Sequence, residues 1–144
     1  MAWLVFLLSI LLPPSVYGQT QNGKAKECPV ALDSLDRLPV FSKGKQAWHA
    51  YLYEHIDMEK IIGEMDSTQY IDYGARQTAI VRFTINTLGR LDDITLENKQ
   101  ALSPTLSKEI ERVLQGASGW TPALVNQQPV ASRVRQSFTF FLAQ

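Results

Sequence analysis

The chain has 144 residues, of which 45% are apolar and 19% charged, so it can form one globular domain with a modest core and short appendages. A second independent domain is not expected. The 14 Lys and Arg residues balance the 14 Asp and Glu residues, which leaves no basic field to attract phosphates. These values argue against nucleic acid as a partner.

The first 18 residues have the pattern of a secretory signal peptide. They carry no charged side chain. Their apolar run, from Trp3 to Leu12, is followed by two prolines and then by the small residues Val16 and Gly18. The run is shorter than the roughly 20 apolar residues of a spanning helix, so cleavage after Gly18 is favoured over an uncleaved anchor. A periplasmic protein is expected, with a polar leader at 19–37 and one domain at 38–144.

The domain is predicted to begin with a helix from about Lys45 to Ile56. Apolar residues recur there at spacings of three and four and make one helical stripe. The stripe comprises Ala47, Trp48, Tyr51, Leu52, His55 and Ile56. From Asp57 to Tyr73 the pattern indicates a mixture of helix and loop.

An antiparallel hairpin is predicted next. Its first strand alternates apolar and polar residues, which is typical of a strand with one buried and one solvated face. The buried face comprises Ala79, Val81, Phe83 and Ile85, and the solvated face Thr78, Arg82, Thr84 and Asn86. Gly89 supplies the positive φ that the short turn requires, and Leu91, Ile94 and Leu96 form the returning strand.

A second helix is predicted between Ser103 and Gly116. Ser103 is a suitable N-cap, Pro104 fits the first helical position, and Gly116 is expected to end the helix in the left-handed conformation. The buried stripe comprises Leu106, Ile110, Val113 and Leu114. The helix is therefore amphipathic and packs on the rest of the domain.

The last element is predicted to be a long strand with two unlike faces. One face carries Val134, Phe138, Phe140 and Leu142, and the other Arg133, Arg135, Ser137 and Thr139. The order helix, strand, strand, helix, strand predicts an α+β fold. We expect a three-stranded antiparallel sheet in the order 2-1-3, with both helices on one face and the last strand at an edge.

Five segments of the chain, in order, resemble the C-terminal domain of the TonB energy transducers, especially the forms common in Bacteroidetes. LPVFSKGKQAWHAYL stands where the family has Pro-x-Phe-x-Gly-Gly before its first helix, and IVRFTINTLGRLDDITL is similar to its hairpin. LSPTLSKEIERVL resembles the second helix, GWTPALVNQQPV the Trp-x-Pro-Ala and Asn-Gly-x-Pro-Val motifs, and QSFTFFL the last strand. Lys45 and Gln127 stand where the family has glycine.

The resemblance implies a binding function, because the last strand of such domains accepts a short extended segment of a TonB-dependent outer-membrane receptor by strand addition. It also implies a link to energy-dependent transmembrane transport. We expect Arg133, Arg135 and Gln136 to contact this partner. The candidate partner-binding residues are Ser132, Arg133, Val134, Arg135, Gln136, Ser137, Phe138 and Thr139. The residues expected to have structural roles in the motifs are Gly89, Trp120, Pro122 and Pro129.

The alternative is a stand-alone periplasmic adaptor or competitor, or a cell-wall-binding module, that transmits no force. Inner-membrane motor proteins and a second copy of the chain, as a strand-swapped homodimer, are further candidate partners.

The sequence does not predict an enzyme. His49 and His55 lie six positions apart, which is not a same-face spacing on a helix, and the single Cys28 lies far from both. Asp92 and Asp93 are adjacent and point to opposite faces of a strand, so they cannot act as a carboxylate pair. No cofactor and no metal are expected. An enzyme of unrecognised type is the third hypothesis, and activity dependent on either histidine would support it.

Overall fold

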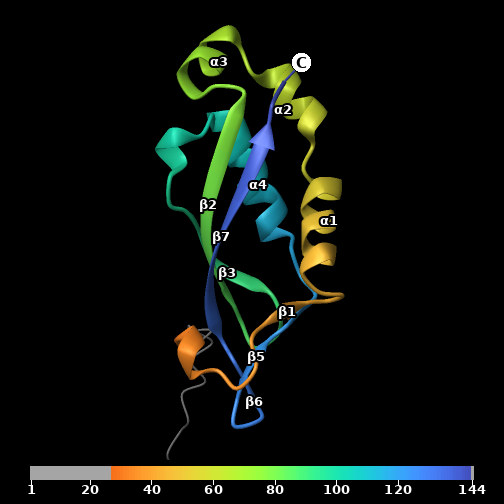
Figure 1. The fold of residues 1–144 in the computed structure, drawn as a ribbon, viewed down its shortest axis with the longest axis vertical. Coiled ribbons are helices and arrows are strands. Elements are labelled where there is room, and N and C mark those ends of the chain that lie inside the picture. The colour runs from red at the N-terminus through yellow and green to blue at the C-terminus, as the bar shows by residue number, and fades with distance from the viewer. Residues whose placement is uncertain (1–26, 144) are drawn as a thin grey trace, which may run out of the picture.

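The computed structural model describes residues 27–143, so the predicted signal peptide at 1–18 lies outside the described residues. The described part is mixed α+β with antiparallel sheets, as expected (Figure 1). Its helices are η1 (Leu32–Ser34), α1 (Lys45–His55), α2 (Met58–Glu64), α3 (Ser67–Tyr73), η2 (Lys99–Ala101) and α4 (Pro104–Gln115). Its strands are β1 (Val40–Phe41), β2 (Arg76–Ile85), β3 (Leu91–Leu96), β4 (Trp120–Thr121), β5 (Ala123–Val125), β6 (Gln128–Val130) and β7 (Ser132–Phe141).

The main sheet has three antiparallel strands in the order β3-β2-β7. β2 pairs with β7 without interruption from Arg76↔Phe141 to Ile85↔Ser132. β1 pairs with β4 and β5 pairs with β6, which gives two small two-stranded sheets in addition. In Figure 1 the β5–β6 hairpin lies at one end of the molecule and the α2 and α3 helices at the other.

The core lies between one face of the main sheet and the helices. Every second residue of β2 is fully buried, and α4 contributes its predicted stripe. The central β2 and α4 residues, each at most 2% exposed, are Ala79, Val81, Phe83, Ile85, Leu106, Ile110, Val113 and Leu114. In Figure 1, α4 lies behind β2 and β7 while α1 lies beside β7. Period-two burial in the strands and helical burial in α4 explain why these segments form these elements.

Several local predictions are wrong. The expected count of two helices is wrong, because the described residues contain four α-helices. The stretch predicted as a mixture of helix and loop does contain helix, and it forms α2 and α3, each capped by an aspartate side chain. Gly116 ends α4 with φ −84°, which is right-handed, so no left-handed cap forms there. Thr84 and Asn86 are buried rather than solvated. Thr84 pairs with Arg133 of β7 on one side and with Asp92 of β3 on the other. The Asn86 side chain donates to Asp92 and accepts hydrogen bonds from the Leu88 and Arg90 amides of the turn.

The segment from Glu27 to Arg37, which we call the arm, contacts the β2–β3 turn, the start of β7 and the β5–β6 hairpin. The Glu27 carboxylate accepts hydrogen bonds from the backbone and side chain of Thr87 at 3.1 and 2.6 Å. Val30 forms a parallel bridge with Ser132 at the start of β7, and Arg37 forms an antiparallel bridge with Leu124 of β5. The arm therefore covers one end of the open side of β7.

Candidate functional site

The candidate site is the side of β7 that faces away from β2. β7 is ten residues long, and its whole length is paired with β2 on one side. On the other side, the parallel bridge from Val30 to Ser132 is the only strand contact among the described residues. From Arg133 onward, this side of the strand has no neighbouring strand within the described part of the chain.

The backbone groups that face this open side follow from the ladder. The Ile80 carbonyl accepts a hydrogen bond from the Glu97 amide, and the Ile80 amide donates to the Asn98 side chain. The backbone groups of the even-numbered residues of β2 therefore point away from β7. The odd-numbered residues of β2 bond toward β7, where they pair with even-numbered residues such as Val134 and Phe138. The N–H and C=O groups of Arg133, Arg135, Ser137 and Thr139 therefore point to the open side. The Val30 amide, which donates to the Ala131 carbonyl at 2.8 Å, agrees with this alternation.

The side chains of β7 alternate between the two faces of the sheet. Arg133, Arg135 and Ser137 are exposed on the outer face, and Thr139 is half-buried there with its hydroxyl 2.9 Å from that of Thr78. On the core side, Ser132 is buried, Val134 and Phe138 pack on the core as partly buried residues, and Gln136 is half-buried. All eight predicted residues therefore lie on β7, although only some of their side chains face solvent.

Gln136 has a role that the sequence did not indicate. Its side chain lies on the core side of the sheet and accepts a hydrogen bond from Trp48 Nε1 at 2.8 Å. It therefore connects α1 to β7 and does not join the two arginines on the outer face. Arg135 donates to Glu97 at 2.7 Å, and Arg82 forms an ion pair with the same carboxylate at 3.3 Å.

Two hollows lie between α1 and β7. The smaller, of about 90 Å³, is lined by His49, Leu52 and Tyr53 of α1 and by β7 residues 137–140. The larger, of about 250 Å³, lies nearer the start of α1 and is lined by aromatic side chains, Lys45 and Gln136. Side chains of an extended segment placed along β7 and facing α1 would meet both hollows.

Trp120 belongs to an aromatic cluster that supports the larger hollow. Its ring lies 5.4 Å from Phe41 and 5.1 Å from Trp48 between centroids, both edge-on. Its backbone amide donates to the Gly89 carbonyl at 3.2 Å. A Cβ at Gly89, whose φ is +73°, would lie 1.9 Å from the Trp120 carbonyl oxygen. The positive φ expected at Gly89 is confirmed, and the close approach of Trp120 gives it a second reason.

Pro122 and Pro129 lie in the segment between β4 and β7. Pro122 is half-buried after β4, and Pro129 is exposed in β6, opposite Leu124. The two residues that connect β5 to β6, Asn126 and Gln127, have φ values of 49° and 64°. Two successive positive φ values define a type I′ turn, which directs the chain back toward β7.

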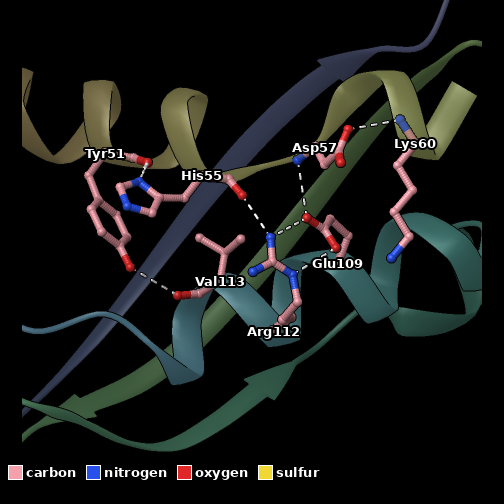
Figure 2. A network of polar contacts seen from close by, with 7 residues as sticks. All are labelled: Tyr51, His55, Asp57, Lys60, Glu109, Arg112 and Val113. Carbon is pink, nitrogen blue, oxygen red and sulfur yellow. Dashed lines mark hydrogen bonds and ion pairs between the residues drawn. The ribbon is translucent and has the colours of Figure 1, made fainter.

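Figure 2 shows a polar network that fastens α1 and α2 to α4. Glu109 of α4 accepts hydrogen bonds from the Asp57 amide at 3.1 Å and from both the Nε and Nη2 atoms of Arg112. Arg112 also donates to the His55 carbonyl at 2.8 Å. We call Glu109 and Arg112 the clamp. Both residues bind backbone groups at the α1–α2 junction, so the contacts position helices rather than a reactive group.

The charges of the clamp stabilise each other. The hydrogen bond from Arg112 lowers the pKa of Glu109, against the opposing effect of burial, and the Asp57 amide adds to the lowering. The same bond raises the pKa of Arg112. Burial raises the pKa of Tyr51, whose hydroxyl donates to the Val113 carbonyl at 3.3 Å. At neutral pH the pair is therefore an ion pair, and Tyr51 keeps its proton.

The two histidines do not meet. His55 stacks on Tyr51 and uses Nδ1 to donate to the Tyr51 carbonyl at 2.8 Å, whereas His49 lines the smaller hollow. Across residues 27–143, no three His, Cys, Asp or Glu side chains are grouped so as to hold a metal ion. Cys28 is exposed in the arm.

No protein-family model matches the chain, and no curated protein matches it. Among the described residues, no helix has both the length and the apolar character needed to cross a membrane.

Proposed function

We propose that this chain is a periplasmic binding domain of the TonB C-terminal type, and that β7 accepts a short extended segment of a TonB-dependent outer-membrane receptor. The proposal includes the three-stranded arrangement with its helices on one face, the exported location and the absence of catalysis. Receptor binding would serve energy-dependent transport. Inner-membrane motor proteins would supply force if the domain acts as a transducer, and a second copy of the chain is a competing occupant of the same edge.

One observation carries the proposal: within residues 27–143, β7 presents beside a helix a regular row of backbone donors and acceptors that pair with no other strand after Ser132. The register with β2 shows no shift over ten residue pairs, so the backbone groups on the open side alternate regularly and can continue the ladder. An added strand gains main-chain hydrogen bonds there, while its alternate side chains face either the outer arginines or α1. Such a site selects an extended peptide and requires no reactive group.

The test is capture of a receptor from detergent-solubilised outer membrane by the purified full chain and a proline variant. Ser137→Pro removes an amide that points to the open side, so it blocks strand addition and leaves the β2 ladder intact. Ser137→Ala is the matched control, because it retains the amide. Val134→Pro is unsuitable, since the Val134 amide faces β2 and its loss would weaken the sheet itself.

We expect the wild type and Ser137→Ala to capture a TonB-dependent receptor and the folded Ser137→Pro variant to lose it. Circular dichroism and thermal unfolding establish that the proline variant is folded. Equal capture by Ser137→Pro, or no capture by the wild type, would contradict docking at β7. If the chain captures a receptor in the absence of motor proteins and the receptor carries out no transport that depends on the chain, the adaptor is favoured.

A further inference from the structure

The arm occupies the first position on the open side of β7. Val30 forms the parallel bridge with Ser132, and its amide donates to the Ala131 carbonyl at 2.8 Å. In a parallel pair, the residue opposite Ser132 bonds to the backbone on either side of it. Val30 therefore stands where the first residue of an added strand would pair. In Figure 1 the arm, drawn in orange, lies beside this end of β7.

The far end of the arm is anchored elsewhere, on the β5–β6 hairpin. The Leu124 carbonyl accepts hydrogen bonds from the Asp36 and Arg37 amides at 2.9 and 3.3 Å, and the Leu124 amide donates to the Arg37 carbonyl at 3.0 Å. The Asp36 carboxylate accepts a further bond from the Asn126 amide. These bonds do not involve β7, so the arm can leave β7 and remain attached to the hairpin.

The contact between the arm and β7 is weak compared with the hold on β7 itself. No residue from Glu27 to Arg37 is buried, and residues 31–34 are exposed. A segment with no buried side chain and few backbone hydrogen bonds opens at a small fraction of the free energy of global unfolding. β7, in contrast, is fixed by ten residue pairs to β2. The arm can therefore detach while the strand keeps its place.

We propose that the arm is an intramolecular competitor that a docking segment displaces from β7. The inference rests on the proposed function and specifies how that site is regulated. A segment that pairs with β7 from Ser132 onward must take the position of Val30, whereas one that begins beside Arg135 leaves the arm in place. Because the two occupants exclude each other, the arm weakens binding by the same factor by which a bound segment weakens the arm's contact.

The competition is tested with two substitutions in the arm. Val30→Pro removes the amide that donates to Ala131, and Val30→Ala is the matched control, because it retains the amide. The arm has no buried residue, so neither change disturbs the core. Capture of a TonB-dependent receptor from detergent-solubilised outer membrane is measured over a series of concentrations of the full chain. We expect Val30→Pro to reach half-maximal capture at an about two- to tenfold lower concentration than Val30→Ala, the factor that one backbone hydrogen bond supplies.

A second measurement follows the arm itself. Cys28 is the single cysteine of the chain and is exposed, so a nitroxide attached to it reports on the arm alone. Electron paramagnetic resonance measures its mobility. We expect restricted motion in the free wild type and greater motion in Val30→Pro. Motion should also increase when the receptor fraction is added to the wild type. The Ser137→Pro variant should keep the restricted spectrum after this addition, because it cannot accept a strand.

The two measurements separate failure of the competition from failure of docking. If Val30→Pro captures the receptor no better than Val30→Ala, or if the label stays restricted in the receptor complex, the arm does not compete and docking at β7 stands. A label that moves freely in the unbound wild type would overturn the inference as well, because the arm would not occupy β7. If neither the wild type nor Val30→Pro captures a receptor, docking at β7 fails and the competition fails with it.

Discussion

The two edges of the main sheet differ in how they are protected. β3 is six residues long, and its register with β2 shifts between Arg82 and Thr84, next to Asp93 with φ 51°. An antiparallel bridge from Arg90 to Ser118 lies just before β3, and α4 packs on it. β7 is ten residues long and keeps one register. Only its first residue is bridged on the open side by the described chain.

This difference shows which edge is suited to accept another strand. Shortness, irregular register and coverage are devices that prevent a sheet edge from pairing with a further chain. β3 has the first two, whereas β7 has only the bridge from Val30 at its first residue and the charges of Arg133 and Arg135 on its outer face. An unprotected regular edge would favour aggregation unless it has a partner, which is why the comparison supports docking at β7. Four predictions test it, in order of decreasing effect.

The largest effect is expected at the turn that joins the protected edge to the centre of the sheet. Gly89→Ala places a Cβ 1.9 Å from the Trp120 carbonyl oxygen and requires a non-glycine residue at φ +73°. The turn must move and lose its bond to the Trp120 amide, so the free energy of unfolding should fall by about 3 kcal/mol or more. Urea denaturation measures the change.

Gly63→Ala in α2 is the matched control for this substitution. A Cβ at Gly63 meets nothing within 4 Å, and alanine favours helix, so the free energy of unfolding should rise by about 0.5–1 kcal/mol. A loss below about 1 kcal/mol at Gly89 would mean that the turn is free to shift. The hydrogen bond between Gly89 and Trp120 would then contribute little to holding the turn before β3.

Hydrogen exchange should separate the two sides of β7 directly. The amides of Arg135 and Ser137 point to the open side, and those of Gln136 and Phe138 point to β2. We expect the first pair to exchange at least about a hundredfold faster than the second in the native protein. NMR-detected exchange at neutral pH measures this, with β2 as the internal control. Uniform protection along β7 would show that another segment or a second copy already covers the open side.

The clamp should matter for α1, which lies beside the open edge. Glu109→Gln keeps an acceptor for the Asp57 amide but removes the charge that binds Arg112, so stability at neutral pH should fall by about 1–2 kcal/mol. The folded-state pKa of Glu109 lies below its ordinary value. Its contribution is therefore fully present above the ordinary carboxylate pKa and is lost as the pH falls through the lowered one.

Denaturation curves from neutral to acidic pH test the clamp. The difference in stability between the wild type and Glu109→Gln should shrink on acidification, because protonated Glu109 resembles glutamine. A difference that is constant with pH would assign the loss to packing rather than to charge. Faster hydrogen exchange in α1 of Glu109→Gln, with exchange in β3 unchanged, would place the effect beside the open side of β7.

The elements that the sequence predicted well depend on local signals. The Ser103 hydroxyl accepts a hydrogen bond from the Leu106 amide at 3.4 Å, Pro104 opens α4, and α1 begins at Lys45. Each of these features is determined by residues within one or two helical turns. The buried faces of β2 and α4 likewise follow from simple periodicity. Antiparallel pairing of β2 with β3 follows from the short turn between them.

The features that the sequence missed depend on distant partners. Nothing near Val30 indicates a bridge to Ser132, and a single bridge has no period that could predict it. Gln136 alternates with the arginines in sequence, but its role depends on Trp48, 88 positions away. Asn86 is the exception, because a side chain that accepts bonds from the Leu88 and Arg90 amides is a known turn signal. Recognition of that signal would have predicted its burial in the turn.

The smallest effect is expected at the turn between β5 and β6, which leads into the open edge. Gln127 has φ 64°, a conformation that glycine adopts without strain and that a residue with a side chain resists. Gln127→Gly should therefore raise the free energy of unfolding by about 0.5–1 kcal/mol, measured by urea denaturation. Asn126→Gly is the comparison variant, and it should gain less, because asparagine tolerates the left-handed region better than glutamine. A loss of stability in Gln127→Gly would show that the side chain supports the hairpin, so that the approach to β7 is held by more than the turn's backbone.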